Sequence, residues 1–340
     1  MSIDESKGRL LVWLPSPLGD AVMCTPALKA IRESMPDKEI FFYGSPIVRQ
    51  TLSPTDFADG WVELKGGILK KISVLKKYRF DTVVLFKNSF SCALTVFLAG
   101  IKKRVGYYRD CRSIFLTDGL KPAKVDGKFV PAPMMDYYLN LLAVIGVSGD
   151  SKKLDLNVDP DSQEQLKEKL PAVFKDDSPL VILVPGGAFG PSKCWPVENY
   201  AEAADYLVDK YNACVVVSVA PNERRISSKI CSISRHRLID LANSPLNMGQ
   251  LKALIGKADL VIANDTGPRH IAIALDRKVI TMFGPNDPKW TDSKHTKEIQ
   301  LVTDVDCAPC QKAECPKGDA ECMRNITVEN VCKAAGELLG

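Results

Sequence analysis

A carboxylate stands just after the first apolar run of the chain. Residues 9–14 are predicted to form a buried strand, and the loop that follows, residues 15–20, ends in Asp20. At the mouth of a parallel sheet, Asp20 is able to meet a substrate and act as a general base. The same position suits a helix N-cap, and Thr25, followed by proline, offers a competing helix start, so both interpretations stay open. The loop lacks the spaced glycines of a dinucleotide fingerprint, which disfavours nicotinamide binding.

A second loop combines glycines with a lysine. Residues 184–196 contain Gly186, Gly187 and Gly190 ahead of Lys193, between an expected strand and an expected helix. Glycines let the backbone come close to a ligand, the amino end of the helix attracts anions, and the lysine adds a full positive charge. These are the parts of a pyrophosphate site. The alternative is a lysine that is only solvated, as loop lysines commonly are.

A third loop, residues 264–270, again joins an apolar strand to a helix. Thr266 and the amide of Gly267 are able to hold phosphate oxygens, and Asp265 is able to orient neighbouring amides or the lysine. The alternative is an ordinary capping turn with His270 packed on the helix. Two such loops at strand ends within one domain favour the binding site.

Four cysteines lie close together near the carboxyl end. They form a C-x2-C-x4-C-x6-C group in a charged loop: Cys307, Cys310, Cys315 and Cys322. Four thiolates suffice for a structural zinc site, but the second pair lacks the close spacing of zinc ligands, so free thiols are favoured. The eleven cysteines of the whole chain are scattered, which is typical of reduced thiols in a reducing compartment.

The elements that position these loops alternate between short apolar runs and amphipathic stretches. This βα pattern is typical of an α/β fold with doubly wound, Rossmann-like parallel sheets, and it occurs twice. Expected strands are 9–14, 39–43, 82–86, 180–184, 214–219, 260–263 and 279–283; expected helices include 89–99, 197–208, 250–257, 269–275 and 328–338. Two such sheets place their carboxyl ends around a cleft, where open parallel sheets bind ligands.

Four segments follow from this pattern. We expect a first Rossmann-like domain over 1–150, a linker over 151–178, a second domain over 179–325 and a final helix over 326–340. The linker is rich in Asp, Lys, Ser and Pro, with one charged helical stretch near 161–170. A single linker makes hinge motion between the domains the default expectation.

The charge is uneven along the chain. The net charge is only +4, and we expect no nucleic-acid partner, but residues 1–150 hold 21 Lys and Arg against 15 Asp and Glu. Most of the excess lies between Lys65 and Arg112, where the acidic residues are Asp81 and Asp110 alone. A solvated helix face accounts for part of it; attraction to an anionic acceptor or an acidic membrane surface is the functional alternative.

The compartment expected from the sequence is the cytoplasm. The longest apolar stretch, residues 90–100, is about half of the roughly 20 residues needed to cross a bilayer. The amino-terminal residues 1–5 are acidic, where a signal peptide would be basic.

In combination and order, these motifs resemble glycosyltransferase family 9, the ADP-heptose lipopolysaccharide heptosyltransferases, over essentially the whole chain. The residues that carry the resemblance are Ser16 to Asp20 with Thr25 to Leu28, Pro185 to Gly187 with Lys193 to Pro196, Asn264 to Gly267 with His270, and Phe283 to Pro285. The cysteine-bearing tail is most similar to that of the heptosyltransferase II branch.

The resemblance implies a glycosyltransferase-B fold and an inverting transfer that needs no metal and no cofactor. By position, Asp20 matches the family's catalytic base. Lys193, beside Gly187, matches the pyrophosphate ligand, and Thr266 and Gly267, flanked by Asp265 and His270, match the phosphate contacts. Glu223 matches the carboxylate that binds ribose, and Leu246 the residue whose backbone meets adenine.

The acceptor side is implied in the same way. Lys87, Asn88, Arg104 and Arg109 fall where the family binds its anionic lipopolysaccharide-core acceptor, which places the enzyme at the inner-membrane surface as a peripheral protein. Arg269 departs from the family pattern, which more often has an apolar or small residue there. Alternatives are another nucleotide sugar used for a different surface polysaccharide, a nucleotide-sugar epimerase of the same fold, and a zinc-binding interaction protein centred on the cysteines.

Overall fold

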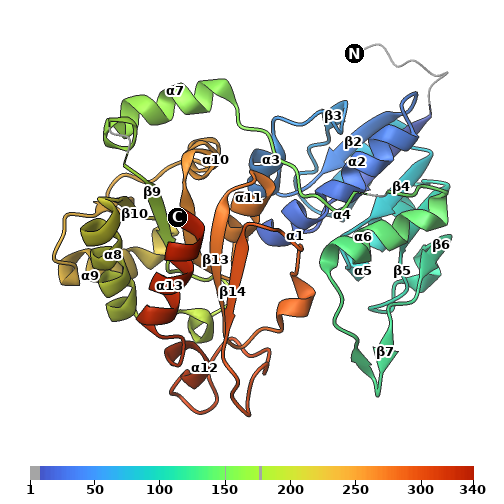
Figure 1. The fold of residues 1–340 in the computed structure, drawn as a ribbon. Helices are drawn as coiled ribbons and strands as arrows, with labels where there is room; N and C mark the ends of the chain where they lie inside the picture. Colours follow the sequence, from blue (N-terminus) through green and yellow to red (C-terminus); the bar gives the residue numbers. More distant parts are fainter. Residues whose placement is uncertain (1–7, 150, 176–177) are drawn as a thin grey trace. The chain divides into compact units, whose positions relative to one another are not determined.

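The computed structural model describes residues 8–149, 151–175 and 178–340, so the acidic residues 1–5 lie outside the described part. The chain divides into two compact units, Met1–Asp155 and Leu156–Gly340. Each is built around a six-stranded parallel sheet with helices on both faces, as expected from the twice-repeated βα pattern (Figure 1).

The sheet of the first unit has the strand order β3-β2-β1-β4-β5-β6. Its strands are β1 (Arg9–Trp13), β2 (Glu39–Tyr43), β3 (Gly60–Trp61), β4 (Thr82–Leu85), β5 (Lys103–Tyr107) and β6 (Asp118–Leu120). Its helices are α1 (Leu18–Met23), α2 (Thr25–Ser34), α3 (Pro46–Leu52), α4 (Ile68–Tyr78), α5 (Phe90–Leu98) and α6 (Met134–Leu142). The chain order reverses between β1 and β4, which is where open sheets of this kind bind ligands.

Helices α4 and α5 cover one face of this sheet. Leu75 of α4 and Val96 of α5 join a buried cluster with the strand residues Leu11, Val83 and Leu85. These strand residues alternate along β1 and β4, so one face of each strand meets the two helices. A short 3-10 turn, η1 (Ser113–Phe115), packs beside α5, and a small hairpin, β7 (Lys124–Val125) with β8 (Lys128–Phe129), precedes α6.

The second unit repeats the topology with the order β11-β10-β9-β12-β13-β14. Its strands are β9 (Leu180–Val184), β10 (Cys214–Val217), β11 (Ile239–Asp240), β12 (Leu260–Asn264), β13 (Lys278–Phe283) and β14 (Glu298–Val302). Its helices are α7 (Pro160–Lys169), α8 (Val197–Tyr211), α9 (Arg224–Ile233), α10 (Met248–Lys257), α11 (Gly267–Ala274), α12 (Glu321–Arg324) and α13 (Val328–Leu339).

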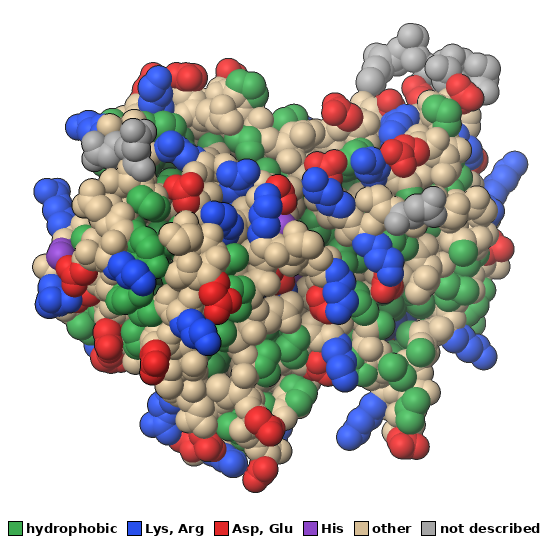
Figure 2. Space-filling model, viewed as in Figure 1, with side chains coloured by type: hydrophobic (Ala, Val, Ile, Leu, Met, Phe, Trp, Pro, Cys, Tyr) green, Lys and Arg blue, Asp and Glu red, His purple; other side chains and the backbone are tan. Residues whose placement is uncertain are grey.

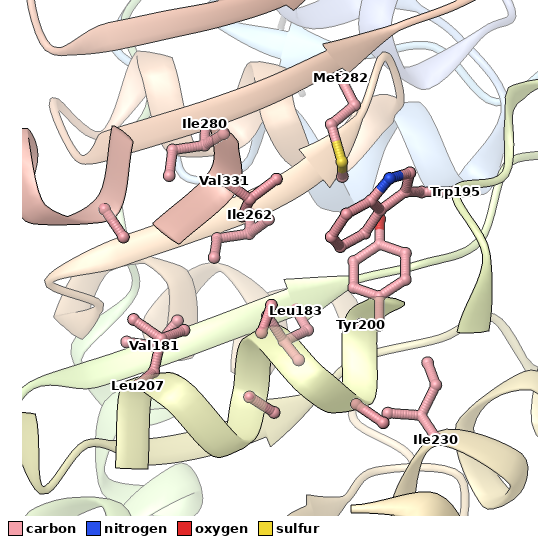
Figure 3. Packing of buried hydrophobic residues seen from close by; sticks show 14 of the residues in the cluster. Val181, Leu183, Trp195, Tyr200, Leu207, Ile230, Ile262, Ile280, Met282 and Val331 are labelled. Carbon is pink, nitrogen blue, oxygen red and sulfur yellow. The ribbon is translucent and has the colours of Figure 1, made fainter. Parts of the chain in front are cut away.

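The core of the second unit centres on two aromatic residues. Trp195 and Tyr200 pack edge to face with ring centroids 5.0 Å apart, next to Leu183 and Met282 (Figure 3). The indole nitrogen of Trp195 donates to the backbone oxygen of Ile326 at 2.8 Å, so the buried ring keeps its hydrogen bond. This contact fastens the chain just before α13 to the loop ahead of α8.

Several element boundaries differ from the expectation. The helical stretch expected near 161–170 is α7, capped by Asp159, and it belongs to the second unit and packs on α10. Helix α11 begins at Gly267, two residues before its expected start, because Pro268 suits the first turn. The final helix lies where expected, with Thr327 as its N-cap. Strand β14 was not expected, because only five residues with a charged start form it.

The surface mixes residue types. On the face seen in Figure 2, acidic and basic side chains are interspersed with apolar ones. None of the helices in the described residues is long and apolar enough to span a bilayer.

Candidate functional site

The carboxyl edge of the second sheet brings the two expected phosphate loops together. One loop follows β9 and the other follows β12, and these strands are neighbours. A Cβ built on Gly187 would lie 3.7 Å from the Cβ of Lys193 and 3.8 Å from the Cγ2 of Thr266. The backbone at Gly187 therefore runs between the lysine and the threonine, and its missing side chain leaves room for a ligand at that edge.

Lys193 is held by Asp265. The Lys193 ammonium donates to the Asp265 backbone oxygen at 2.9 Å and to its carboxylate Oδ2 at 3.2 Å, and both side chains are buried. The Phe189 ring adds a cation–π contact, with the ammonium 4.8 Å from the ring centroid. Lys193 is thus not the freely solvated loop lysine of the alternative interpretation.

Asp265 is held in turn by Arg269. The guanidinium of Arg269, which is completely buried, donates to Asp265 Oδ1 at 3.1 Å and to Glu298 at 2.7 Å. Thr281 accepts from the same guanidinium at 3.0 Å. The departure from the family pattern at position 269 therefore has a structural explanation, because its charge is met by two carboxylates.

The charges of this cluster shift the pKa values of its members. Burial alone would raise the pKa of Asp265, but the charges of Arg269 and Lys193 outweigh it and hold this pKa well below its usual range. Burial also opposes the charged form of Glu298, but the charge and hydrogen bonds of Arg269 outweigh it and lower the pKa of this carboxylate. For His270, burial and then the charge of Arg269 lower the pKa to about 3, so the ring is neutral at physiological pH.

Polar atoms beside this cluster lack partners. Within the described part of the chain, Thr266 Oγ1, His270 Nδ1 and Asn286 Oδ1 are buried without a hydrogen bond. Buried polar groups are nearly always satisfied, so a group of such atoms is typical of a site that binds a polar ligand. Thr266 is the N-cap of α11, whose free backbone N–H groups attract anions. The arrangement is suited to an anionic oxygen.

Two further residues that the sequence assigned to nucleotide binding, Glu223 and Leu246, follow β10 and β11. Glu223 stands against the glycine loop: Oε1 accepts from the Gly187 N–H at 2.9 Å and Oε2 from the Ala220 N–H at 3.0 Å. A side chain at Gly186 would collide with this carboxylate. Leu246 is half-buried in the loop between β11 and α10. The structure thus joins Glu223 to the loop of Gly187 and Lys193 and leaves Leu246 on a neighbouring loop.

The cysteine-bearing segment, residues 307–322, packs against the glycine loop. The backbone N–H of Ser192 donates to the Ala313 oxygen at 3.2 Å, and that of Gln311 donates to the Pro285 oxygen at 2.8 Å. Gly190 has φ 153°, and a Cβ there would lie 2.3 Å from the Ala313 oxygen. The segment therefore supports the loop that carries Lys193.

The structure gives the zinc hypothesis no coordination geometry. Within the described residues no group of three or more His, Cys, Asp or Glu side chains is arranged to hold a metal ion. This includes Cys307, Cys310, Cys315 and Cys322, all of which are free thiols. Backbone N–H groups around Cys315, foremost that of Ala320, lower the pKa of its thiol.

In the first unit, Asp20 follows β1 and lies in the first turn of α1. The N-cap of α1 is Pro17, so the interpretation of Asp20 as a helix N-cap is wrong. Helix α2 starts separately at Thr25, with Cys24 as its N-cap and Pro26 in its first turn. Asp20 is half-buried, and its negative charge adds to burial in raising the pKa values of Cys24 and Tyr138. A carboxylate in the first turn interacts favourably with the dipole of the helix.

Lys87 and Asn88 lie at the same sheet edge, after β4. The Lys87 backbone N–H donates to the Trp13 oxygen at 3.2 Å, which joins the ends of β4 and β1. The buried Arg112 donates to the Lys87 oxygen at 2.6 Å and to Asn88 Oδ1 at 2.8 Å. Asn88 in turn donates to the Tyr137 hydroxyl at 3.0 Å. Arg112 thus fixes the conformation of both residues.

Arg109 follows β5 at this edge and also reaches Tyr137. Burial raises the pKa of Tyr137, while its hydrogen bonds to Arg109 and Asn88 act in the opposite direction. The Tyr137 ring stacks on Tyr107 with centroids 3.7 Å apart. Asn88 and Arg109 therefore both contact Tyr137, and Lys87 precedes Asn88 at the same edge.

Arg104 does not belong to this group. It is the second residue of β5 and pairs in register with Val83, near the amino ends of the strands and not at their carboxyl edge. Its guanidinium donates to the backbone oxygens of Phe115 and Ile101 and lies 5.4 Å from the Phe97 ring centroid. Its expected place beside the acceptor residues is therefore wrong, because a sequence distance of five residues spans the length of the strand.

Sequence reasoning missed three residues of these clusters. Arg112 was counted only as part of a basic stretch, and Tyr137 and Glu298 carried no motif. Arg112 and Asn88 are 24 positions apart, and Arg269 and Glu298 are 29 apart. No local spacing signals such pairs.

Comparison with known proteins gives consistent matches. The family model described as glycosyltransferase family 9 (heptosyltransferase) matches residues 68–321. Lipooligosaccharide heptosyltransferase 2 of Haemophilus influenzae is 30% identical over 275 residues, 77% of each chain. The protein of that name from Campylobacter jejuni is 25% identical, covering 97% of this chain and 98% of its own.

A solved structure, the ADP-heptose lipopolysaccharide heptosyltransferase II of Escherichia coli, has the same fold. It superposes with a TM-score of 0.82 at 23% identity, covering 97% of this chain and 98% of its own. This likeness shows the glycosyltransferase-B fold that the sequence implied.

Proposed function

The chain belongs to glycosyltransferase family 9, the heptosyltransferases, and from this premise we propose that it transfers a heptose from ADP-heptose to the inner core of lipopolysaccharide, in the Kdo-lipid A region. It is a glycosyltransferase. The observation that carries the specific donor is the near full-length similarity to proteins named heptosyltransferase 2.

In the proposed reaction an acceptor hydroxyl attacks the anomeric carbon of the donor. Asp20 takes the hydroxyl proton as the new C–O bond forms. The bond from the anomeric carbon to the diphosphate breaks, and ADP leaves with the electron pair. Attack from the side opposite the leaving group inverts the anomeric centre.

The leaving diphosphate is proposed to bind at the carboxyl edge of the second sheet. Lys193, the Gly267 N–H and the Thr266 hydroxyl would receive its developing negative charge. Two arrangements support this: Asp265 and Phe189 hold the lysine in place, and the Thr266 oxygen is buried without a partner in the described residues. His270, kept neutral by burial, would contribute a hydrogen bond and no charge.

The remaining contacts are proposals of the same kind. Glu223, which follows β10 next to β9, is proposed to bind the ribose. The backbone of Leu246, which follows β11 on the far side of β10, is proposed to meet the adenine. Lys87, Asn88 and Arg109 are proposed to bind the anionic acceptor. Since that acceptor is a lipid of the inner leaflet, the enzyme is proposed to act in the cytoplasm as a peripheral protein of the inner membrane.

A nucleotide panel tests the donor. Thermal unfolding would be measured with ADP, UDP, GDP and CMP at equal concentrations, and we expect the largest rise in Tm with ADP, because the tightest ligand stabilises the folded state most. A larger rise with UDP or GDP would instead favour a relative that uses another nucleotide sugar. Transfer from ADP-heptose to Kdo-lipid A, followed by mass spectrometry, tests the reaction, and a sugar epimerised without acceptor would contradict it.

A further inference from the structure

Exposed apolar side chains gather on one side of the first unit. Among the described residues, 13 large apolar side chains are exposed, and six of them come from α4, α5 and η1. They are Ile68 and Leu69 of α4, Phe90, Phe97 and Leu98 of α5, and Ile114 of η1. Leu69 is 81% exposed and Ile114 is 78% exposed.

These side chains belong to a continuous layer. Helix α4 packs against α5, and α5 packs against η1. The Phe115 ring of η1 lies 5.2 Å from the ring of Phe90 and 5.4 Å from that of Phe97, centroid to centroid. The inner side of the layer covers the sheet through residues such as Leu75 and Val96, and its outer side bears the exposed apolar side chains. We call this outer side the α4–α5 face.

Positive charge surrounds the same face. Helix α4 carries Lys70, Lys71, Lys76 and Lys77, and Lys102 and Lys103 follow α5. No ion pair with a described acidic residue engages any of the four lysines of α4. From Lys65 to Arg109 the single acidic residue is Asp81, and it is engaged by Lys38, Thr82 and the Arg9 N–H.

We propose that the α4–α5 face docks on an anionic lipid bilayer. Apolar side chains flanked by lysines are the surface that enters the interface between headgroups and acyl chains, where lysine stems extend to the phosphates. Each lysine near an anionic leaflet contributes about 1 kcal/mol, so several of them with a few inserted side chains suffice for reversible binding. A protein partner fits less well, because lysine is depleted from protein–protein interfaces.

The position of this face relates it to the proposed acceptor site. Helix α5 begins at Phe90, two residues after Asn88, so docking holds the acceptor-binding edge beside the headgroups. This consequence rests on the proposed function, but membrane binding itself does not. The two are therefore tested separately.

The test is flotation of the full-length protein with lipid vesicles. Vesicles of phosphatidylcholine are compared with vesicles containing about 30 mol% phosphatidylglycerol. We expect binding to the anionic vesicles only, weakened in about 0.5 M salt because screening shortens the reach of the lysines. Equal binding to both compositions, or binding to neither, would overturn the proposal.

Two variants locate the surface. Leu69→Ser/Leu98→Ser/Ile114→Ser is expected to lower affinity for anionic vesicles at least about tenfold, because the inserted side chains are lost. The matched control, Val125→Ser/Ile233→Ser/Val302→Ser, changes three exposed apolar residues elsewhere and should bind as the wild type does. Equal losses in both, or none in the first, would contradict the proposal.

Four further measurements separate the alternatives. The Leu69/Leu98/Ile114 variant should keep the wild-type Tm, the wild-type Tm rise with ADP, and transfer to a delipidated acceptor. If the wild type is dimeric in light scattering and this variant is monomeric, the face is covered by a second copy and the membrane proposal fails. If vesicle binding follows expectation while ADP has no effect on Tm, the proposed function fails and the docking surface stands.

Discussion

Lys193 and Asp265 are joined twice, since the lysine ammonium donates both to the backbone oxygen of Asp265 at 2.9 Å and to its carboxylate at 3.2 Å. An ammonium has three N–H donors, and these two bonds use two of them. The other carboxylate oxygen is held by Arg269 at 3.1 Å. The lysine is therefore oriented before any ligand arrives, which lowers the cost of organising the site.

Replacing Lys193 should reduce ligand binding and catalysis without unfolding the protein. Lys193→Met should keep a stable fold, because Asp265 retains Arg269 as its charge partner. It should lose most of the ADP-induced rise in Tm, and kcat/KM for heptose transfer should fall roughly 10²- to 10³-fold, as for other lost charge-stabilising groups. Lys210→Met, at an exposed position on α8, is the control and should behave as the wild type. Unchanged kcat/KM in Lys193→Met would remove it from the site.

Replacing Asp20, the proposed base, should affect the reaction rate but not ADP binding. Asp20→Asn should reduce kcat by about 10²- to 10⁴-fold, because no base remains to take the proton of the attacking hydroxyl. It should leave the ADP-induced rise in Tm unchanged. Asp56→Asn, at an exposed site of the same unit, serves as control. The measurements are initial rates with saturating donor and thermal unfolding with ADP. Full activity of Asp20→Asn would end its assignment as the base.

The buried pair of Arg269 and Glu298 is expected to be coupled. Arg269→Met should lower the free energy of unfolding by roughly 3–5 kcal/mol, because Glu298 is left buried without its partner. The double variant Arg269→Met/Glu298→Met removes both charges and should lose much less than the sum of the two single changes. Urea unfolding of the wild type, both single variants and the double variant measures this difference. Additive losses would show that the two residues act independently.

His270 should make stability depend on pH. Its pKa is about 3 in the folded protein against an ordinary value of 6.5, so between these values the unfolded chain binds one more proton. Stability is then fully present above pH 6.5 and falls as the pH drops, by up to about 1.4 kcal/mol per pH unit.

The variant His270→Gln should remove this component. Urea unfolding between pH 6.5 and about 4.5 measures it, above the range where the lowered pKa of Asp265 begins to contribute. His295→Gln, a change of the same type at a less buried site, is the control. An unchanged slope in His270→Gln would mean that the ring is not buried in its neutral form.

Alanine substitutions at two glycines of one loop should have different effects, one mainly on stability and the other mainly on ADP binding. Gly190→Ala places a Cβ 2.3 Å from the Ala313 oxygen at a backbone φ of 153°, and it should cost roughly 2–3 kcal/mol of unfolding free energy. Gly187→Ala meets only ordinary contacts, 3.7 Å or longer, so it should cost less than about 1 kcal/mol. Its effect should appear as weaker ADP binding in calorimetry, because the Cβ fills the space beside Lys193. Equal stability of both variants would contradict the close packing of the loop on residues 307–322.

The sequence by itself determined the architecture and the places of the loops. Strand and helix periodicity are local properties, so both parallel sheets and most element ranges followed from them. In a parallel sheet all carboxyl ends share one edge, which is why the loops of Lys193 and Asp265 could be expected to meet. The family's motifs then assigned roles to Asp20, Thr266 and Glu223, and these roles remain proposals.

Only the tertiary structure decided which side chains form hydrogen bonds and ion pairs with one another. It placed Arg104 at the amino ends of the strands, removed the N-cap interpretation of Asp20, and paired Arg269 with Glu298 of an unexpected strand. It also separated the mostly exposed lysines of α4 from the buried Arg112. The physical reason is that such partners are chosen by packing between elements far apart in the chain, and spacing along the sequence carries no signal of it.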